Sequence, residues 1–182
     1  MSTVLILISI FIIVVFFKKG IPTLNSHWNT MIDNFKFSTT EFYSLLTKEL
    51  KSHGVNNIKV YEKKISIGNA ISTKRLYLRV KWKNYTYDCC CAPFGNGTFI
   101  SWYLFTEKTG IKLFVSKIPF IGNYLVQAFF PVTYYSIDTS SMFLSYAQTS
   151  VLNVIDNITI ESGLRSLTEQ ERKPIMKDIF KR

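Results

Sequence analysis

Three consecutive cysteines, Cys89, Cys90 and Cys91, are the side chains best suited to nucleophilic or metal chemistry. Metal sites usually need cysteines about two to four residues apart and a second pair of ligands, which this sequence lacks. Neighbouring residues of a strand point to opposite faces, so these thiols cannot bridge one another. We expect Cys89 and Cys91 in the core and Cys90 facing outward, where nearby cations would make it the one candidate for a reactive thiol.

The sequence offers few groups for imidazole or carboxylate catalysis. His27 and His53 are the two histidines, and any Ser-His or Cys-His mechanism must use one of them. His53 follows Glu49 by four residues near a predicted helix end, a position typical of charge pairing. The acidic residues are scattered, and Asp138 alone lies in an apolar stretch. We therefore predict no catalytic residue, metal ligand or cofactor, and favour a non-enzymatic role.

Basic residues are concentrated between residues 59 and 83. This segment holds eight Lys or Arg residues and one acidic residue, Glu62, in a chain of formal charge +10. The alternation in KRLYLRVKWK, residues 74–83, predicts a strand with one buried apolar face and one exposed basic face. We expect anionic lipid or a protein partner to meet this face, while nucleic acid is not favoured because no known nucleic-acid-binding pattern is present. The residues predicted to form the face are Arg75, Arg79, Lys81, Lys83, Lys63, Lys64 and Tyr77.

The residues around this strand predict an antiparallel meander. A capping box and a stripe of leucines indicate a helix over 39–53, and a strand follows at 57–66. A two-residue turn at 83–84 would pair Arg79 with Asp88 on adjacent strands, and a Gly-rich turn would add a fourth strand. The expected fold class is α+β, with a helix, a meander of four to five antiparallel strands, and C-terminal helices packed on one face.

The C-terminal half is largely apolar. The run at 119–130 is too short for a membrane span and predicts a helix, either in the core, which we favour, or in the membrane interface. A fifth strand is expected at 132–137. A helix over about 138–160, capped at or just after Asp138, and a short amphipathic helix over 168–180 complete the chain.

A second hypothesis is a small membrane-bound enzyme or ligand-binding domain. Its pocket would lie between the sheet and the C-terminal helix, lined by aromatic rings, with Asp138, Tyr134 or Cys90 as polar groups. The hypothesis depends on the abundance of Tyr and Phe, 10 and 15 residues, which core packing explains equally well.

The first 18 residues predict a membrane anchor. Residues 4–17, VLILISIFIIVVFF, are uncharged and, with the three residues before them, reach about 25 Å as a helix, the lower limit for a span. Lys18 and Lys19 follow, and basic residues collect on the cytoplasmic side. The expected topology is a single pass in the plasma membrane with the N-terminus outside. A cleaved signal peptide is the alternative, but positive charge before the run and small residues after it are missing.

The expected organisation is a transmembrane anchor at 1–18, a juxtamembrane linker at 19–37 and a cytosolic α+β domain at 38–182. With 47% hydrophobic residues and no repeats, the chain is neither disordered nor fibrous. The leading functional hypothesis is a membrane-anchored, non-enzymatic interaction or accessory module. Its basic sheet face would meet anionic lipid or a protein partner, and the apolar segment at 118–132 would support the attachment.

Overall fold

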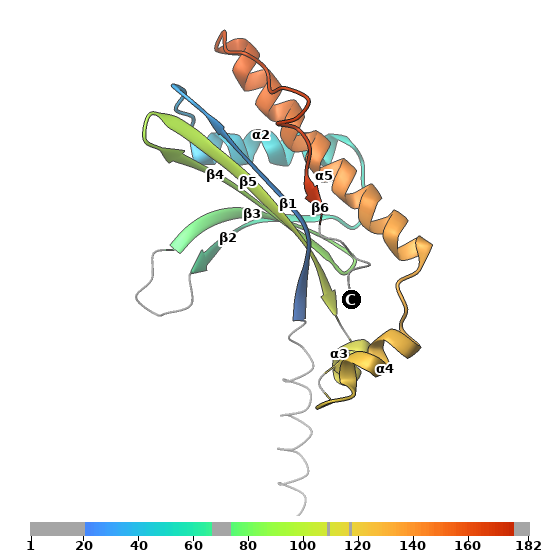
Figure 1. The fold of residues 1–182 in the computed structure, drawn as a ribbon. Helices are drawn as coiled ribbons and strands as arrows, with labels where there is room; N and C mark the ends of the chain where they lie inside the picture. The colour runs from blue at the N-terminus through green and yellow to red at the C-terminus, as the bar shows by residue number, and fades with distance from the viewer. Residues whose placement is uncertain (1–20, 67–73, 109, 117, 177–182) are drawn as a thin grey trace, which may run out of the picture.

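The computed structural model of this chain describes residues 21–66, 74–108, 110–116 and 118–176. They form an α+β fold with a six-stranded antiparallel sheet and four helices (Figure 1). The expected α+β class with an antiparallel sheet is confirmed, but the sheet has six strands where the sequence predicts four to five. The predicted anchor at 1–18 lies outside the described residues. Within the described ranges, no helix is both long enough and apolar enough to cross a membrane.

The sheet contains the predicted meander and two further strands. Its strands are β1 (Ile21–Ile32), β2 (Lys59–Ser66), β3 (Lys74–Trp82), β4 (Tyr85–Phe94), β5 (Gly97–Lys108) and β6 (Ile175–Met176). They lie in the order β2-β3-β4-β5-β1-β6. The predicted register of β3 and β4 is confirmed, since Arg79 pairs with Asp88, and β5 pairs with β4 as the predicted fourth strand.

β1 corrects the expected linker at 19–37. This strand pairs antiparallel with β5 along its length, from Ile21 opposite Lys108 to Ile32 opposite Thr98. A register shift between Leu24 and Ser26 marks a bulge, which moves later side chains to the other face and obscures the alternation in the sequence. Residues 21–32 therefore belong to the sheet rather than to a linker.

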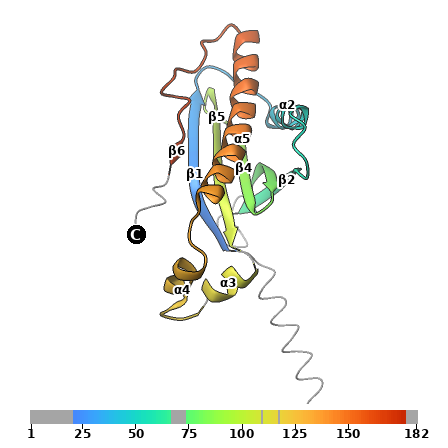
Figure 2. The same cartoon turned by 90° about the vertical axis from the view of Figure 1, so that its right-hand side faces the viewer.

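Two helices cover one face of the sheet, as Figure 2 shows. α2 (Thr39–Ser52), with Ser38 as its N-cap, confirms the predicted first helix, and α5 (Tyr134–Glu161) packs beside it. Apolar side chains of both helices and of the covered sheet face form one core. Its fully buried members include Phe42, Leu46, Leu50, Val80, Tyr87, Ile100, Trp102, Ala147, Val151 and Ile155.

Two predicted C-terminal elements are wrong. Residues 134–137 of the expected fifth strand begin α5, because Thr133 and Ser136 form a reciprocal capping box just before Asp138. Aromatic and β-branched residues had favoured a strand there, but the cap decides the conformation. The described part of the expected helix at 168–180 consists of turns and β6 instead.

Two short helices lie at the end of the sheet where β1 begins (Figure 1). They are α3 (Gly110–Ser116) and α4 (Gly122–Phe129). Gly122 and Val126 are the buried residues of α4, and most of the others are exposed. The favoured core interpretation of 119–130 is therefore wrong.

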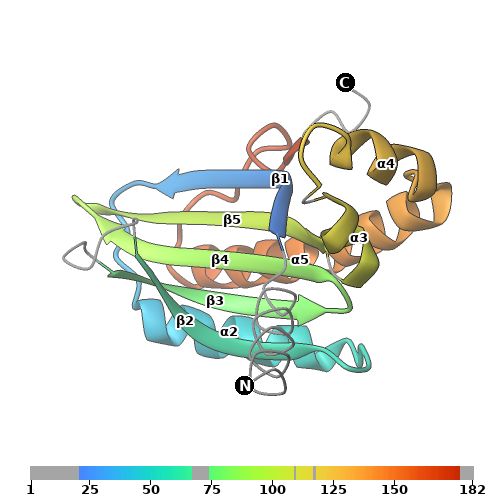
Figure 3. The same cartoon turned by 90° about the horizontal axis from the view of Figure 1, so that it is seen from below.

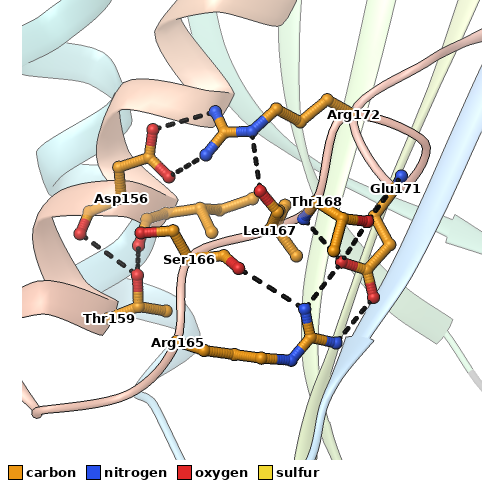
Figure 4. A network of polar contacts seen from close by, with 9 residues as sticks. Asp156, Thr159, Arg165, Ser166, Leu167, Thr168, Glu171 and Arg172 are labelled. Atoms are coloured by element: carbon orange, nitrogen blue, oxygen red, sulfur yellow. Dashed lines mark hydrogen bonds and ion pairs between the residues drawn. The ribbon is translucent and has the colours of Figure 1, made fainter.

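A polar network holds the C-terminal tail, here residues 162–176, between α5 and β1 (Figure 4). Arg172 donates two hydrogen bonds to Asp156 of α5, at 3.0 and 2.7 Å. Arg165 donates two to Glu171, at 3.0 and 2.9 Å. The indole N–H of Trp28 donates to the Glu171 carbonyl oxygen at 2.6 Å, so the tail is joined to both elements.

The contacts of the C-terminal tail make the stability of the fold sensitive to acid. Hydrogen bonds from Arg165 and then Thr168 lower the pKa of Glu171 to about 2. A carboxylate with a depressed pKa stabilises the folded state above its ordinary pKa of about 4.5 and loses this effect as the pH falls toward 2. Glu171→Gln should therefore lower the melting temperature at pH 7, and its difference from the unsubstituted chain should shrink between about pH 4.5 and 2.

Melting of the full chain in detergent micelles, followed by circular dichroism, measures this difference. Glu161→Gln, at the exposed end of α5, is the matched control and should leave the melting temperature unchanged. A Glu171→Gln penalty that stays constant over the whole pH range would contradict the assignment.

Candidate functional site

The sheet face opposite α2 and α5, here called the outer face, carries a row of polar and aromatic side chains. Figure 3 shows β2 to β5 and β1 in front of the two long helices, so neither helix covers this face. Residues directly opposite each other on antiparallel strands point to the same side. The pairings from β1 to β2 therefore define a single line, the polar row, which consists of His27, Tyr103, Asp88, Arg79 and Tyr61.

An ion pair between Arg79 and Asp88 forms the centre of the polar row. Arg79 Nε donates to Oδ1 and Nη2 donates to Oδ2, both at 2.6 Å. The two side chains are only 15% and 4% exposed. Hydrogen bonding to Asp88 raises the pKa of Arg79 above its ordinary value, so the guanidinium stays charged. Such a bidentate pair fixes both groups and leaves little of Arg79 free for a ligand.

Aromatic rings flank this pair. His27 stacks on Tyr103 with 6.3 Å between ring centroids, and Tyr103 stacks on Phe105 at 6.5 Å. On the other side, Tyr61 is 42% exposed and hydrogen-bonds Arg79. The polar row therefore presents aromatic groups on both sides of a neutralised centre.

Three exposed basic residues extend the outer face along β2 and β3. Lys59 and Lys63 lie opposite Lys81 and Tyr77, which places them on this face, and Arg75 is the next outward residue of β3. All three are exposed, and none of them forms an ion pair with another residue that the structure describes. We call Lys59, Lys63 and Arg75 the basic edge.

Lys81 is a different case, because its charge is compensated. Its ammonium lies 2.9 Å from a Glu107 oxygen on β5. Burial alone would raise the pKa of Glu107, but hydrogen bonds from Lys81 and Thr86 lower it. Lys81 and Arg79 thus both have their charge compensated within the sheet.

The predicted basic face is only partly assembled. Arg75, Arg79, Lys81, Lys63 and Tyr77 lie on the outer face. Lys64 lies opposite Leu76, on the side of the helices. Lys83 sits in the β3–β4 turn with its ammonium 4.4 Å from the centre of the Trp82 ring, so it also leaves the outer face.

Sequence reasoning missed Lys59 and Tyr61 as members of this face, and His27 as a member of the polar row. The weak alternation of β2 does not reveal which of its sides faces outward, although pairing with the strongly alternating β3 determines it. The bulge of β1 concealed His27 in the same way. No pattern within either strand alone could have placed these side chains.

Cys90 lies on the outer side of β4, as expected, but it is not an exposed thiol. It is fully buried, and burial raises its pKa even though the Arg75 guanidinium, which hydrogen-bonds it, acts in the opposite direction. Cys89 and Cys91 are buried in the core as predicted, and burial raises the pKa of Cys91 to about 12. A small side chain at the centre of a sheet is covered by its larger neighbours, which explains the failure of the reactive-thiol prediction.

The candidate pocket of Asp138, Tyr134 and Cys90 does not form. Asp138 and Tyr134 are exposed near the start of α5, and Cys90 lies on the far side of the sheet. A groove of about 250 Å³ between α2 and α5 is instead lined by charged and apolar side chains, among them Glu49. Glu49 already accepts a hydrogen bond from Asn153 at 2.8 Å. In the residues with assigned positions, no cluster of three or more His, Cys, Asp or Glu side chains could hold a metal ion.

The sequence matches no protein-family model and no curated protein. Among solved structures, that of TTHA0849 from Thermus thermophilus is similar over 70% of this chain and 97% of that chain, with 16% identity and a TM-score of 0.20. A TM-score this low supports no inference about fold or function.

The buried ion pair predicts an asymmetric mutational response. Arg79→Ala leaves the Asp88 carboxylate buried without its partner, which should lower the free energy of unfolding by about 3–5 kcal/mol. Removing both charges with Arg79→Met and Asp88→Leu should recover most of this loss, because no unpaired charge remains. Urea unfolding of the full chain in micelles provides the measurement.

Lys81→Met is the matched control, since its ion pair with Glu107 is more exposed and should contribute less than about 1 kcal/mol. Equal losses for Arg79→Ala and Lys81→Met would contradict the burial of an unpaired carboxylate as the cause of the Arg79→Ala loss.

Proposed function

We propose that this protein is a membrane-anchored, non-enzymatic module that docks the outer face of its sheet on anionic lipid. The proposal is carried by the basic edge, whose three cations remain outside the ion pairs that neutralise Arg79 and Lys81. Each basic residue near an anionic membrane surface contributes about 1 kcal/mol to binding. A surface of anionic headgroups offers the diffuse negative charge that such an edge would meet.

The short connection to the proposed anchor supports the same function. The apolar run ends at residue 17 and β1 begins at residue 21. Four fully extended steps cover at most about 14 Å, so the start of the sheet would remain close to the headgroups. A tether this short limits how far the basic edge can move from the lipid surface.

The arrangement of the domain agrees with this orientation. In the view from the end where β1 begins, the outer face is turned toward the viewer and α2 and α5 lie behind it (Figure 3). A membrane on that side would meet the outer face before it met the long helices. A protein partner on the basic edge is the competing outcome of the experiments below.

Topology is tested first with a cysteine added on α5. Ser145 is exposed, whereas Cys89, Cys90 and Cys91 are buried and cannot report the compartment. We expect Ser145→Cys in intact cells to react with a membrane-impermeant maleimide only after permeabilisation. The unsubstituted chain is the control and should stay unlabelled until it is denatured. Labelling of Ser145→Cys in intact cells would place the domain outside and remove the cytoplasmic leaflet as its target.

Lipid docking is tested by charge reversal on the basic edge. The full chain carries a polarity-sensitive dye on Tyr61→Cys and is reconstituted into phosphatidylcholine vesicles with or without phosphatidylserine. Phosphatidylserine should shift the dye emission to the blue, and high salt should reverse the shift. Lys59→Glu, Lys63→Glu and Arg75→Glu together should lower the ratio of docked to undocked chains on the order of 100-fold or more.

A matched variant separates local from overall charge. Lys36→Glu, Lys48→Glu and Lys173→Glu change the net charge equally at exposed positions outside the basic edge and should keep the blue shift. Equal loss in both triple variants would mean that net charge alone drives binding. No shift in anionic vesicles, with the anchor still embedded, would reject lipid docking and favour a protein partner.

A further inference from the structure

The α3–α4 hairpin is a packed unit of its own. A Cβ atom at Gly122 would lie 2.6 Å from the Val115 carbonyl oxygen, so only glycine allows the two helices this approach. Leu113 and Val126 are buried. The hairpin therefore has a packed interior, and its remaining residues form a solvent-exposed surface.

The solvent-exposed surface of the hairpin is aromatic and apolar. Tyr124 and Phe129 are each 72% exposed, and Phe120 is fully exposed. Ile111, Ile121 and Val132 are exposed as well. Exposed apolar groups gathered in one place mark an interaction site more often than single ones do.

Phe120 also has an unfavourable backbone conformation. Its φ of 64° lies in the left-handed region, which bulky side chains rarely adopt. The turn between α3 and α4 thus holds an aromatic ring out in solvent at a local cost. Such strain is typical of functional positions.

The charge of this region points to lipid. The sequence has no acidic residue from 109 to 137 but contains Lys112 and Lys117. Asn123 and Gln127 are exposed among the aromatic residues of α4. Aromatic rings, amides and cations without carboxylates are the composition of a segment that lies at headgroup level.

The position of the hairpin also points to lipid as its partner. Ile21 at the start of β1 lies opposite Lys108 at the end of β5, and α3 begins two residues later, at Gly110. The apolar run at 4–17 ends just before β1 in the sequence. Any membrane that holds this run would lie at the end of the sheet where the hairpin projects (Figure 1).

We propose that the α3–α4 hairpin is a second membrane attachment that lies in the lipid–water interface, with Phe120, Tyr124 and Phe129 in the bilayer. This inference rests on the proposed function, because it takes the anchor as its first attachment. It adds a contact that depends on apolar and aromatic groups rather than on anionic lipid. Two attachments at one end of the sheet would fix the tilt of the outer face toward the membrane.

The experiment measures the depth of nitroxide labels in the full chain, reconstituted in phosphatidylcholine alone. Single cysteines are introduced as Phe120→Cys, Phe129→Cys, Ile10→Cys in the apolar run and Ser145→Cys on α5, while the native thiols are buried. Labels in lipid collide more with oxygen than with a water-soluble nickel complex. We expect this result at 120, 129 and 10, and the reverse at 145.

Each outcome separates the hairpin from the anchor and from the basic edge. Lipid exposure at 10 with water exposure at 120 and 129 overturns the hairpin proposal and leaves the proposed function standing. A water-exposed label at residue 10 overturns the anchor. If the label at 120 is nevertheless in lipid, the hairpin proposal is still supported. Water-exposed labels at 10, 120 and 129 overturn both the anchor and the hairpin proposal. Dipolar broadening between labels at 120 overturns the proposal in favour of a second copy of the chain. Because these vesicles contain no anionic lipid, failure of basic-edge docking cannot produce any of these results.

Discussion

The pairing of β1 along β5 is the interaction on which the other features depend. It turns residues 21–32 into an inner strand of the sheet, with β6 hydrogen-bonded along its free side at Ser26 and His27. The same strand supplies Trp28, whose indole holds the C-terminal tail, and His27, which begins the polar row. In the sequence, β1 follows the apolar N-terminal run at 4–17 after three residues. One strand thus connects the tail, the outer face and the proposed anchor.

Local patterns predicted the centre of the fold well. The alternation of β3 and the short β3–β4 turn determine the register to β4, so pairing of Arg79 with Asp88 could be read from the sequence. β1 could not be read in this way, because its bulge breaks the two-residue period and its pairing partner lies far along the chain. The start of α5 was misjudged because a two-residue cap, Thr133 and Ser136, outweighs the strand preference of the residues between and beside them.

The candidate site required long-range information. The sequence located the basic segment, but the availability of each charge depends on its partner across the sheet, such as Glu107 on β5 for Lys81. The exposure of the α3–α4 hairpin could not be predicted from the sequence either, because an apolar composition is the same for a core helix and for one that meets lipid. The position of Gly122 against Val115 and the burial of Leu113 and Val126 show which side of the hairpin is its interior.

The short connection before β1 also sets an effective concentration. A domain held about 14 Å or less from its target surface meets that surface as an intramolecular partner, at effective concentrations that reach the millimolar range for short tethers. Under those conditions a face with a weak intrinsic affinity is still occupied much of the time. With the proposed anchor in place, the modest charge of the basic edge would then suffice, and the domain could exchange between lipid and a competing partner while it stays tethered.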